Sequence, residues 1–177
     1  MSFTDKKCLV AYYSRKGQNY VNGSIVELKV GNTEVVAGMI RKITGGDLFH
    51  IKAVKAYPEG YTETTDVAKD ELRANARPEL TGNVENMDSY DIIFLGYPNW
   101  WGTMPMPVFT FLEKYNFSGK TIVPFCTHEG SGSGRSEQDI KKLCPRSIVL
   151  KGIAIRGGSV GSSDTQVSEW IDKLSIV

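Results

Sequence analysis

The chain has 177 residues, of which 41% are hydrophobic and 23% charged, as expected for one compact globular domain. Its 21 basic and 20 acidic residues leave a net charge of +1, which gives no support for nucleic acid or an anionic membrane as a partner. The three cysteines form no CxxC pair, and with only two histidines they offer no zinc spacing. No apolar stretch approaches the ~18 residues of a membrane helix. The odd cysteine count and the lack of a recognisable leader predict a cytoplasmic protein.

Short apolar runs alternate with stretches of helical periodicity along the chain. The apolar runs are typical of strands buried on both faces of a sheet, and they cover residues 7–13, 47–52, 91–96, 121–126 and 147–156. The helical stretches cover residues 33–44, 61–76, 105–115, 136–143 and 164–174. Such alternation predicts βαβ units around one parallel sheet.

Residues 20–30 break this alternation. They contain Asn22-Gly23 between two extended runs, which is the strongest short signal for a β-hairpin. A type I′ turn needs positive φ at both central positions, and Asn and Gly tolerate it best. We therefore expect a small hairpin between the first strand and the first helix.

Polar residues follow the first strand and begin the first helix. The strand is followed by Ser14-Arg15-Lys16-Gly17-Gln18-Asn19, and the helix starts at Gly31-Asn32-Thr33. In an open parallel sheet, ligands bind at the carboxyl ends of the strands, and a helix N-terminus attracts a phosphate. Asn32 and Thr33 can equally serve only as a helix N-cap, so this segment alone leaves both interpretations open.

The loop after the third strand holds two adjacent tryptophans. It reads Gly96-Tyr97-Pro98-Asn99-Trp100-Trp101-Gly102-Thr103. Both indoles cannot point into a strand or helix core, and large aromatic rings at a strand end suit stacking on a planar ligand. Gly102 allows the backbone to approach such a ligand closely. The alternative is a loop that folds its own tryptophans onto the domain.

The loop after the fourth strand is rich in glycine and serine. It reads Thr127-His128-Glu129-Gly130-Ser131-Gly132-Ser133-Gly134, which offers many backbone donors and little side-chain bulk. Such a loop fits along one edge of a flat cofactor, or it is a plain exposed connection. His128 is more consistent with a loop polar group or a ring contact than with a general base, because no Ser or Cys nucleophile pairs with it.

These three loops lie at one end of one predicted sheet. Together they describe a phosphate cradle, an aromatic wall and a glycine-rich edge, which suit a phosphorylated, planar, aromatic ligand. No G-x-G-x-x-G follows the first strand and no Walker A loop is present, so a dinucleotide or P-loop site fits less well. The stretch from Tyr57 to Tyr61 either borders this ligand or packs on the sheet.

Four segments resemble the flavodoxin family, and most closely its branch of short flavodoxin-like proteins. They are Tyr12-Tyr13-Ser14, Gly31-Asn32-Thr33, the loop at residues 96–105, and the segment at residues 124–132. The resemblance implies a three-layer, doubly wound α/β fold over residues 1–177, with a five-stranded parallel sheet of order 2-1-3-4-5. It also implies non-covalently bound FMN.

The resemblance further implies roles for individual residues. The phosphate of FMN is expected at Ser14, Lys16, Asn32 and Thr33. One side of the isoalloxazine is expected at Pro98, Asn99, Trp100, Trp101 and Gly102. Its other edge is expected at Thr127, His128, Glu129, Gly130 and Gly132.

Two departures from the family pattern bear on function. The usual continuous Thr/Ser-x-Thr-Gly-x-Thr loop is replaced by residues 14–19 and an intervening hairpin. The net charge of +1 also lacks the acidic excess that steers electron shuttles to basic partners. The missing acidic excess weakens the interpretation as an electron shuttle relative to an oxidoreductase. The resemblance implies electron transfer through FMN, to a redox partner protein or a small-molecule acceptor. The alternatives are an NAD(P)H-dependent FMN oxidoreductase of the quinone-reductase type, or a partner-binding module that keeps the fold without redox turnover. Oligomeric state stays open.

Overall fold

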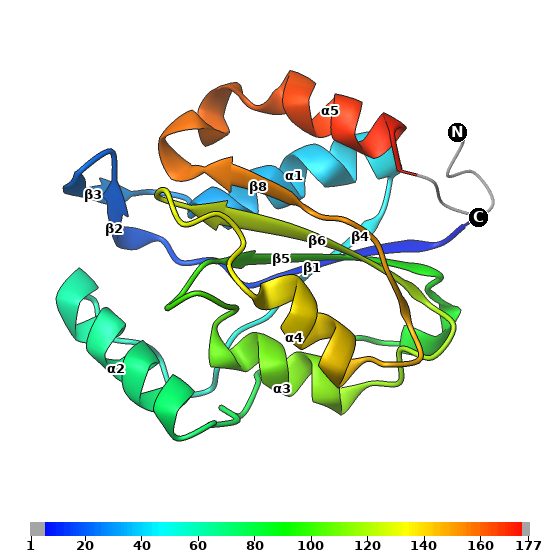
Figure 1. Ribbon diagram of the computed structural model, residues 1–177, viewed down its shortest axis with the longest axis horizontal. Helices are drawn as coiled ribbons and strands as arrows, with labels where there is room; N and C mark the ends of the chain where they lie inside the picture. Colours follow the sequence, from blue (N-terminus) through cyan, green and yellow to red (C-terminus); the bar gives the residue numbers. More distant parts are fainter. Residues whose placement is uncertain (1–5, 175–177) are drawn as a thin grey trace.

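The computed structural model describes residues 6–174, so residues 1–5 and 175–177 of the domain expected at 1–177 lie outside the described residues. At its centre is a parallel sheet of six strands (Figure 1). The strands are β1 (Cys8–Tyr12), β4 (Asp47–His50), β5 (Ile92–Pro98), β6 (Thr121–His128), β7 (Ile148–Val149) and β8 (Ile153–Arg156). The order is β4-β1-β5-β6, with β7 and β8 both paired to β6, which confirms the predicted order 2-1-3-4-5.

The single strand expected over residues 147–156 is wrong in one respect, because it is split into β7 and β8. β7 pairs with the start of β6 and β8 with its end, so the break faces Pro124 in the middle of β6. Proline has no N–H to continue a ladder. At the break, a Cβ on Gly152 would lie 2.5 Å from the carbonyl oxygen of Pro124, so the chain passes too closely for a side chain.

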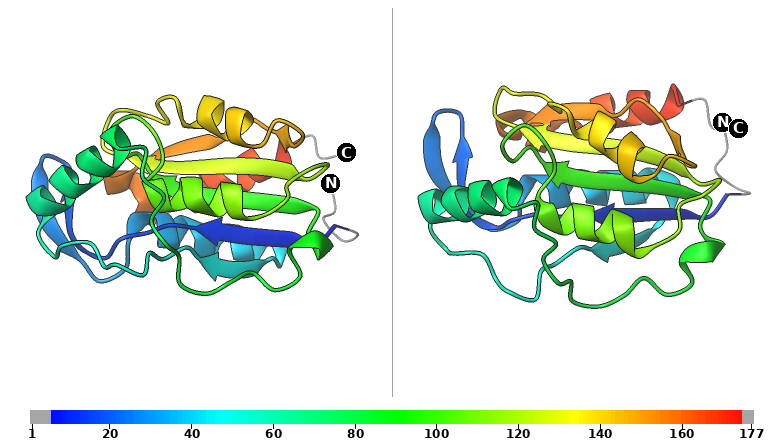
Figure 2. Two further views of the ribbon diagram at one scale, coloured as in Figure 1. Left: turned by 90° about the horizontal axis from the view of Figure 1, so that it is seen from below. Right: turned by 60° about the horizontal axis from the view of Figure 1, so that its bottom comes forward.

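Five helices cover the two faces of the sheet and one edge of its carboxyl end (Figure 2). They are α1 (Asn32–Thr44), α2 (Tyr61–Arg73), α3 (Met106–Lys114), α4 (Ser136–Leu143) and α5 (Asp164–Asp172). Helices α1 and α5 lie on one face of the sheet, and α3 and α4 on the other. Helix α2 stands apart, beside the carboxyl ends of the strands. All five begin and end within three residues of the expected bounds.

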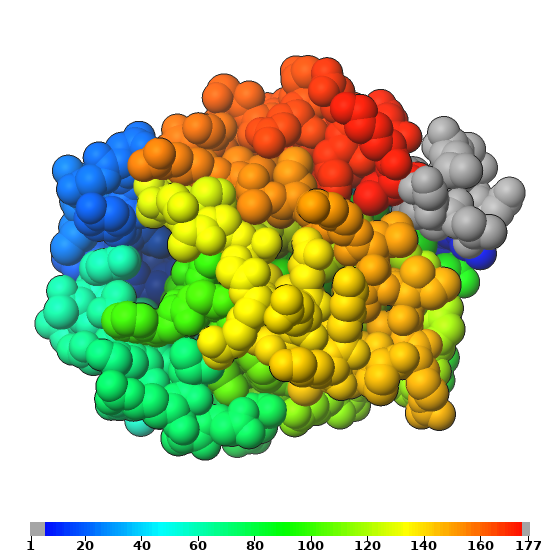
Figure 3. Space-filling view, in the orientation of Figure 1, coloured from blue at the N-terminus to red at the C-terminus, as the bar shows by residue number. Residues whose placement is uncertain are grey.

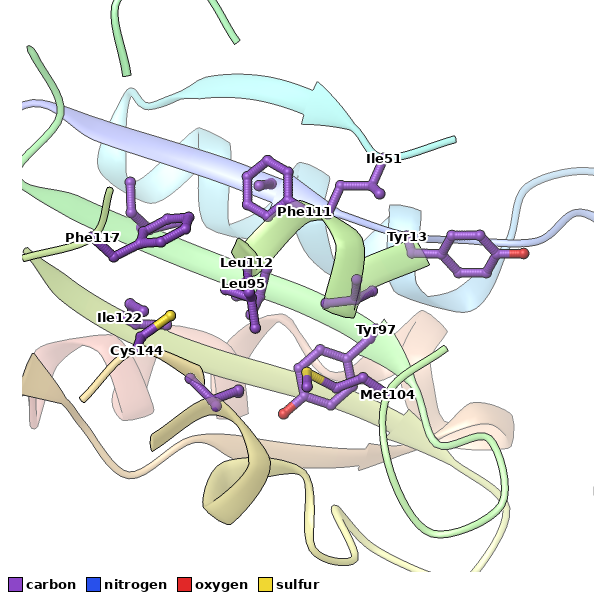
Figure 4. Close-up of a cluster of buried hydrophobic side chains, with 14 of the residues drawn as sticks. Tyr13, Ile51, Leu95, Tyr97, Met104, Phe111, Leu112, Phe117, Ile122 and Cys144 are labelled. Carbon is purple, nitrogen blue, oxygen red and sulfur yellow. The ribbon is translucent and has the colours of Figure 1, made fainter. Parts of the chain in front are cut away.

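Alternate residues of each central strand enter opposite cores, because successive side chains of a strand point to opposite faces. In β1, Leu9 and Ala11 pack toward α3 and α4, whereas Val10 and Tyr12 pack toward α1 and α5. Figure 4 shows the first of these cores, where Leu112 of α3 lies over Leu95 of β5 and Phe111 lies over β1. Both faces of the sheet are therefore covered, and its carboxyl end is left as the place for a ligand.

The predicted hairpin is present, and it stands over the carboxyl end of the sheet. It consists of β2 (Gly17–Val21) and β3 (Ser24–Leu28), which pair antiparallel. The turn residues Asn22 and Gly23 have φ of 50° and 88°, as a type I′ turn requires. The hairpin begins at Gly17, so half of the loop expected at residues 14–19 is strand. Among the described helices, none is long and apolar enough to cross a bilayer.

Candidate functional site

A cleft of about 270 Å³ opens at the carboxyl ends of β1, β5 and β6. Figure 3 shows this side of the molecule hollowed between the blue hairpin, the start of α2 and the green and yellow loops. Nine of the expected site residues line the cleft: Ser14, Asn32, Thr33, Pro98, Asn99, Trp100, Thr127, His128 and Glu129. The structure therefore brings together residues from all three loops that the sequence singled out.

The other five expected residues do not line this cleft. Lys16 is exposed and faces a separate groove, because the chain turns into β2 at Gly17. Trp101 lines an adjoining cavity instead. Gly102, Gly130 and Gly132 are not among the lining residues, and all three have positive φ in the loops that carry the lining.

Ser14 caps the first turn of α1, where an anion could bind. Its hydroxyl accepts a hydrogen bond of 3.0 Å from the N–H of Glu34, the third residue of that helix. A Cβ on Gly31 would lie 2.2 Å from Ser14 Oγ, so only glycine permits this approach. Within residues 6–174, the N–H groups of Asn32 and Thr33 have no acceptor. Two helix-terminal donors are therefore left for a ligand such as a phosphate.

Arg15 supplies the positive charge that was expected from Lys16. Its guanidinium donates to the carbonyl oxygens of Pro58, at 2.9 Å, and Glu59, at 2.6 Å, and also to that of Gln18. Carbonyl oxygens orient the side chain but do not cancel its charge, and no carboxylate within the described part of the chain pairs with it. Arg15 lines the cleft, so its charge favours an anionic ligand there.

The role of Arg15 was not predicted, because its position depends on carbonyl groups more than 40 residues away. Asn19 and Tyr20 were also missed as lining residues, because both belong to the hairpin that folds back over the cleft. Tyr20 stacks on Tyr61 at the start of α2, with ring centroids 6.0 Å apart and an interplanar angle of 28°. This aromatic pair joins the hairpin to α2 across the mouth of the cleft.

The two tryptophans of the second loop have different surroundings. Trp100 is half-buried and makes edge contacts with the rings of Tyr13, at 5.3 Å, and Tyr57, at 5.2 Å. Trp101 is 48% exposed and donates its indole N–H to the carbonyl oxygen of Thr65, at 2.9 Å. Trp100 therefore both packs on the domain and lines the cleft, whereas Trp101 rests against α2.

Trp101 adopts a backbone conformation that is rare for a large side chain. It has φ of 55° and Gly102 has φ of 85°, in a tight turn closed by the bond from Trp100 N–H to Thr103 O, at 2.9 Å. A left-handed conformation at a residue other than glycine costs on the order of 1–3 kcal/mol and persists only where the surroundings enforce it. Such strain is typical of ligand-binding loops.

Asn99 holds the second and third loops together. Its side-chain N–H donates to the carbonyl oxygen of Gly132, at 2.7 Å, and its Oδ1 accepts from the N–H of Gly102, at 2.8 Å. Deeper in the same corner, Thr33 and Thr127 are hydrogen-bonded through their hydroxyls, at 2.8 Å. These hydrogen bonds therefore connect the walls of the cleft to one another.

The third loop carries a histidine and a partly buried carboxylate. His128 Nδ1 accepts from the N–H of Gly130, at 2.9 Å, and burial lowers the pKa of His128, so the ring is neutral at pH 7. Glu129 Oε2 accepts from the N–H of Asn22, at 3.0 Å, and faces the guanidinium of Arg156, at 3.8 Å. Its other oxygen, Oε1, is buried with no partner among the described residues.

An unpaired buried acceptor fits a ligand that carries hydroxyl or ring N–H donors. FMN carries both, and its phosphate fits the free donors at Asn32 and Thr33. The residues present therefore fit this group. No cluster of three metal-ligating side chains was found in residues 6–174.

Comparisons with known proteins identify a family and similar folds. The model of the family described as Flavodoxin matches residues 7–174. A candidate flavoprotein from Bacteroides eggerthii is 28% identical, with 97% of this chain and 99% of that chain covered and a TM-score of 0.78. A flavoprotein from Lactobacillus acidophilus, solved in complex with FMN, is 24% identical, with 94% and 99% covered and a TM-score of 0.67. Among curated proteins, none matches the sequence.

Proposed function

The chain belongs to the flavodoxin family, and on that premise we propose that it binds FMN in the cleft and transfers electrons through it. When bound, FMN supplies the redox chemistry, since it exchanges one or two electrons. The protein's part is to bind and orient the cofactor and to control what reaches it.

The observation that carries this proposal is that the two parts of the cleft differ in chemical character. One part offers hydrogen-bond donors and a positive charge, and the other offers flat, largely apolar side chains. The free N–H groups of Asn32 and Thr33 and the guanidinium of Arg15 are suited to a phosphate. Trp100 and Pro98 offer flat, largely apolar contact for a ring system. The similar protein from Lactobacillus acidophilus, which was solved with FMN, supports the same assignment.

The chain's own residues also limit the access of water and partners. The Tyr20–Tyr61 stack lies over the cleft, and Glu129 holds the tip of the hairpin through the N–H of Asn22. A cofactor beneath this cover is shielded more than one in an open loop site. This cover and the near-zero net charge both favour a small-molecule electron acceptor. A redox partner protein is the other acceptor that we propose.

We also propose the cytoplasm as the location of the protein. Cys8, Cys126 and Cys144 are all free, buried thiols. Unpaired cysteines are the usual state in a reducing compartment.

The test is to purify the protein, load it with FMN and compare FMN with riboflavin. We expect a yellow protein that binds FMN on the order of 100-fold more tightly than riboflavin, because charge-assisted hydrogen bonds to the phosphate add to the ring contacts. A colourless protein that takes up no FMN would contradict the proposal. Anaerobic addition of NAD(P)H then separates two roles: bleaching indicates a reductase, whereas reduction by dithionite alone indicates a carrier.

A further inference from the structure

A groove of about 1030 Å³ lies between the hairpin and the loop that follows β4. One side is formed by residues 16–18 and 27–30, and the other by residues 50–53 and 55–59, all of which lie outside the cofactor cleft. Most pockets for small molecules measure about 300–1,000 Å³, so this groove is large for such a ligand. An extended segment of polypeptide is a ligand that suits a groove of this size.

Lysine side chains stand on both sides of the groove. Lys16 and Lys29 belong to the hairpin side, and Lys52 and Lys55 belong to the loop side. All four are exposed, and within residues 6–174 none of them forms an ion pair. A ligand with several carboxylates could therefore contact ammonium groups on both sides at once.

Carboxylates also line the groove, but the effect of the lysines is the larger one at His50. Glu27, Glu34 and Glu59 are part of the lining, as is His50. Burial lowers the pKa of His50, and the charge of Lys52 lowers it further, which outweighs the opposite effect of Glu34. The electrostatic potential at this point of the groove is therefore positive, as an anionic ligand requires.

Aromatic rings connect the groove with the cofactor cleft. Tyr13 and Tyr57 line the groove, whereas Trp100 lines the cleft. The ring of Trp100 makes edge contacts with both tyrosines, with centroids 5.3 Å from Tyr13 and 5.2 Å from Tyr57. A protein docked in the groove would therefore contact the same aromatic cluster as a ligand in the cleft. This position suits a partner that exchanges electrons with that ligand.

We propose that the groove docks an acidic segment of the redox partner protein. The proposal rests on the proposed function and specifies the docking surface and the charge of that partner. A net charge of +1 gives little steering over the whole molecule, but a local cluster of cations raises the rate at which an acidic partner associates.

The test measures binding of a fluorescein-labelled peptide of five Glu-Ser repeats to FMN-loaded protein, by fluorescence anisotropy. We expect binding that weakens at least about tenfold between about 20 mM and about 200 mM NaCl, because salt screens exposed charges. The matched peptide of five Gln-Ser repeats carries no side-chain charge and should not bind.

Two double variants test the two sides of the groove. Lys16→Glu with Lys29→Glu changes the hairpin side, and Lys52→Glu with Lys55→Glu changes the loop side. Each should weaken binding of the acidic peptide at least roughly tenfold. FMN should stay bound, as judged from its visible absorbance, because none of the four lysines lines the cleft.

The matched control is Lys141→Glu with Lys142→Glu, which reverses the same number of charges. Both lysines are exposed in the last turn of α4, and this helix contacts β7, at the edge of the sheet opposite β4. The control should bind the acidic peptide as the wild type does.

Four results would overturn the proposal. They are no binding of the acidic peptide, a loss confined to one side of the groove, an equal loss in the control, or tighter binding of a peptide of five Lys-Ser repeats. The last result would mean that the carboxylates of the groove dominate. If the protein takes up no FMN, the proposed function fails separately. The same titration of FMN-free protein then still decides the docking surface, since lysine-dependent binding supports it and its absence refutes it.

Discussion

The hydroxyl of Ser14, directly after β1, accepts a hydrogen bond of 3.0 Å from the N–H of Glu34 in the first turn of α1. Ser14 therefore acts as an N-cap from a distant part of the chain, across the inserted hairpin. In most helices the capping side chain comes from the residue just before the helix. Here that residue is Gly31, which makes room for Ser14.

We predict that Ser14→Ala weakens both the fold and cofactor binding. Loss of a capping side chain costs about 1 kcal/mol of unfolding free energy. Binding of FMN should weaken about tenfold, because the helix start that offers its free N–H groups is less well held. Urea unfolding and FMN titration measure the two effects. Ser118→Ala, in an exposed loop at the other end of the sheet, is the control and should change neither.

We predict opposite effects for alanine at two glycines. A Cβ added at Gly102 or at Gly38 would meet no other part of the chain within 4 Å. The backbone conformation alone therefore decides whether alanine raises or lowers the free energy of unfolding. Gly102 has φ of 85°, where alanine is strained, and Gly102→Ala should destabilise by about 1–2 kcal/mol. Gly38 lies inside α1, where Gly38→Ala should stabilise by about 0.5–1 kcal/mol. Thermal unfolding of both variants checks the signs, and equal signs would contradict this account.

Local signals predicted the elements better than the site. Asn22-Gly23 predicted its turn because the required positive φ is a property of those two residues alone. The apolar runs predicted the strands, whereas their order was implied by the resemblance to the flavodoxin family, and the structure confirms that order. The break between β7 and β8 was not predicted, because it depends on Pro124 in the adjacent strand.

The lining of the cleft was predicted where its residues follow strands directly, and it was missed where it depends on distant contacts. Ser14 and Trp100 line the cleft from loops directly after parallel strands, and Thr127 lines it from the carboxyl end of β6. Arg15, and not Lys16, lines the cleft, because its guanidinium donates to the carbonyl groups of Pro58 and Glu59 just before α2. Nothing in the sequence near residue 15 indicates those carbonyl groups.

We predict that Asn99→Ala loosens the two loops that Asn99 joins. It loses the bonds to Gly132 O, at 2.7 Å, and from Gly102 N–H, at 2.8 Å, in a half-buried site, at a cost of about 1–3 kcal/mol. The amide of Gly102 should exchange with deuterium faster, together with amides of residues 130–134. The control is Asn116→Ala, since the side chain of the exposed Asn116 makes only a local bond, to Ser118 N–H, among residues 6–174. Exchange that is unchanged in Asn99→Ala would refute the link.

The remaining prediction concerns the dependence of stability on pH. Burial lowers the pKa of His128 from its ordinary value of 6.5, and Nδ1 can accept from Gly130 N–H only when unprotonated. As pH falls, the unfolded chain therefore takes up the proton first, which favours unfolding. The contribution of neutral His128 is complete above pH 6.5 and is lost as pH falls through the lower, folded-state pKa.

His128→Asn isolates this effect, because the amide oxygen can still accept from Gly130 N–H but does not titrate. We expect the unfolding free energy of the wild type to fall, relative to that of the variant, between pH 7.5 and pH 5. Burial and the charge of Lys52 also lower the pKa of His50, but His50 is present in both proteins and cancels in the difference. Urea unfolding at several pH values measures this difference. A difference that stays constant across the range would show that His128 titrates alike in the folded and unfolded chains.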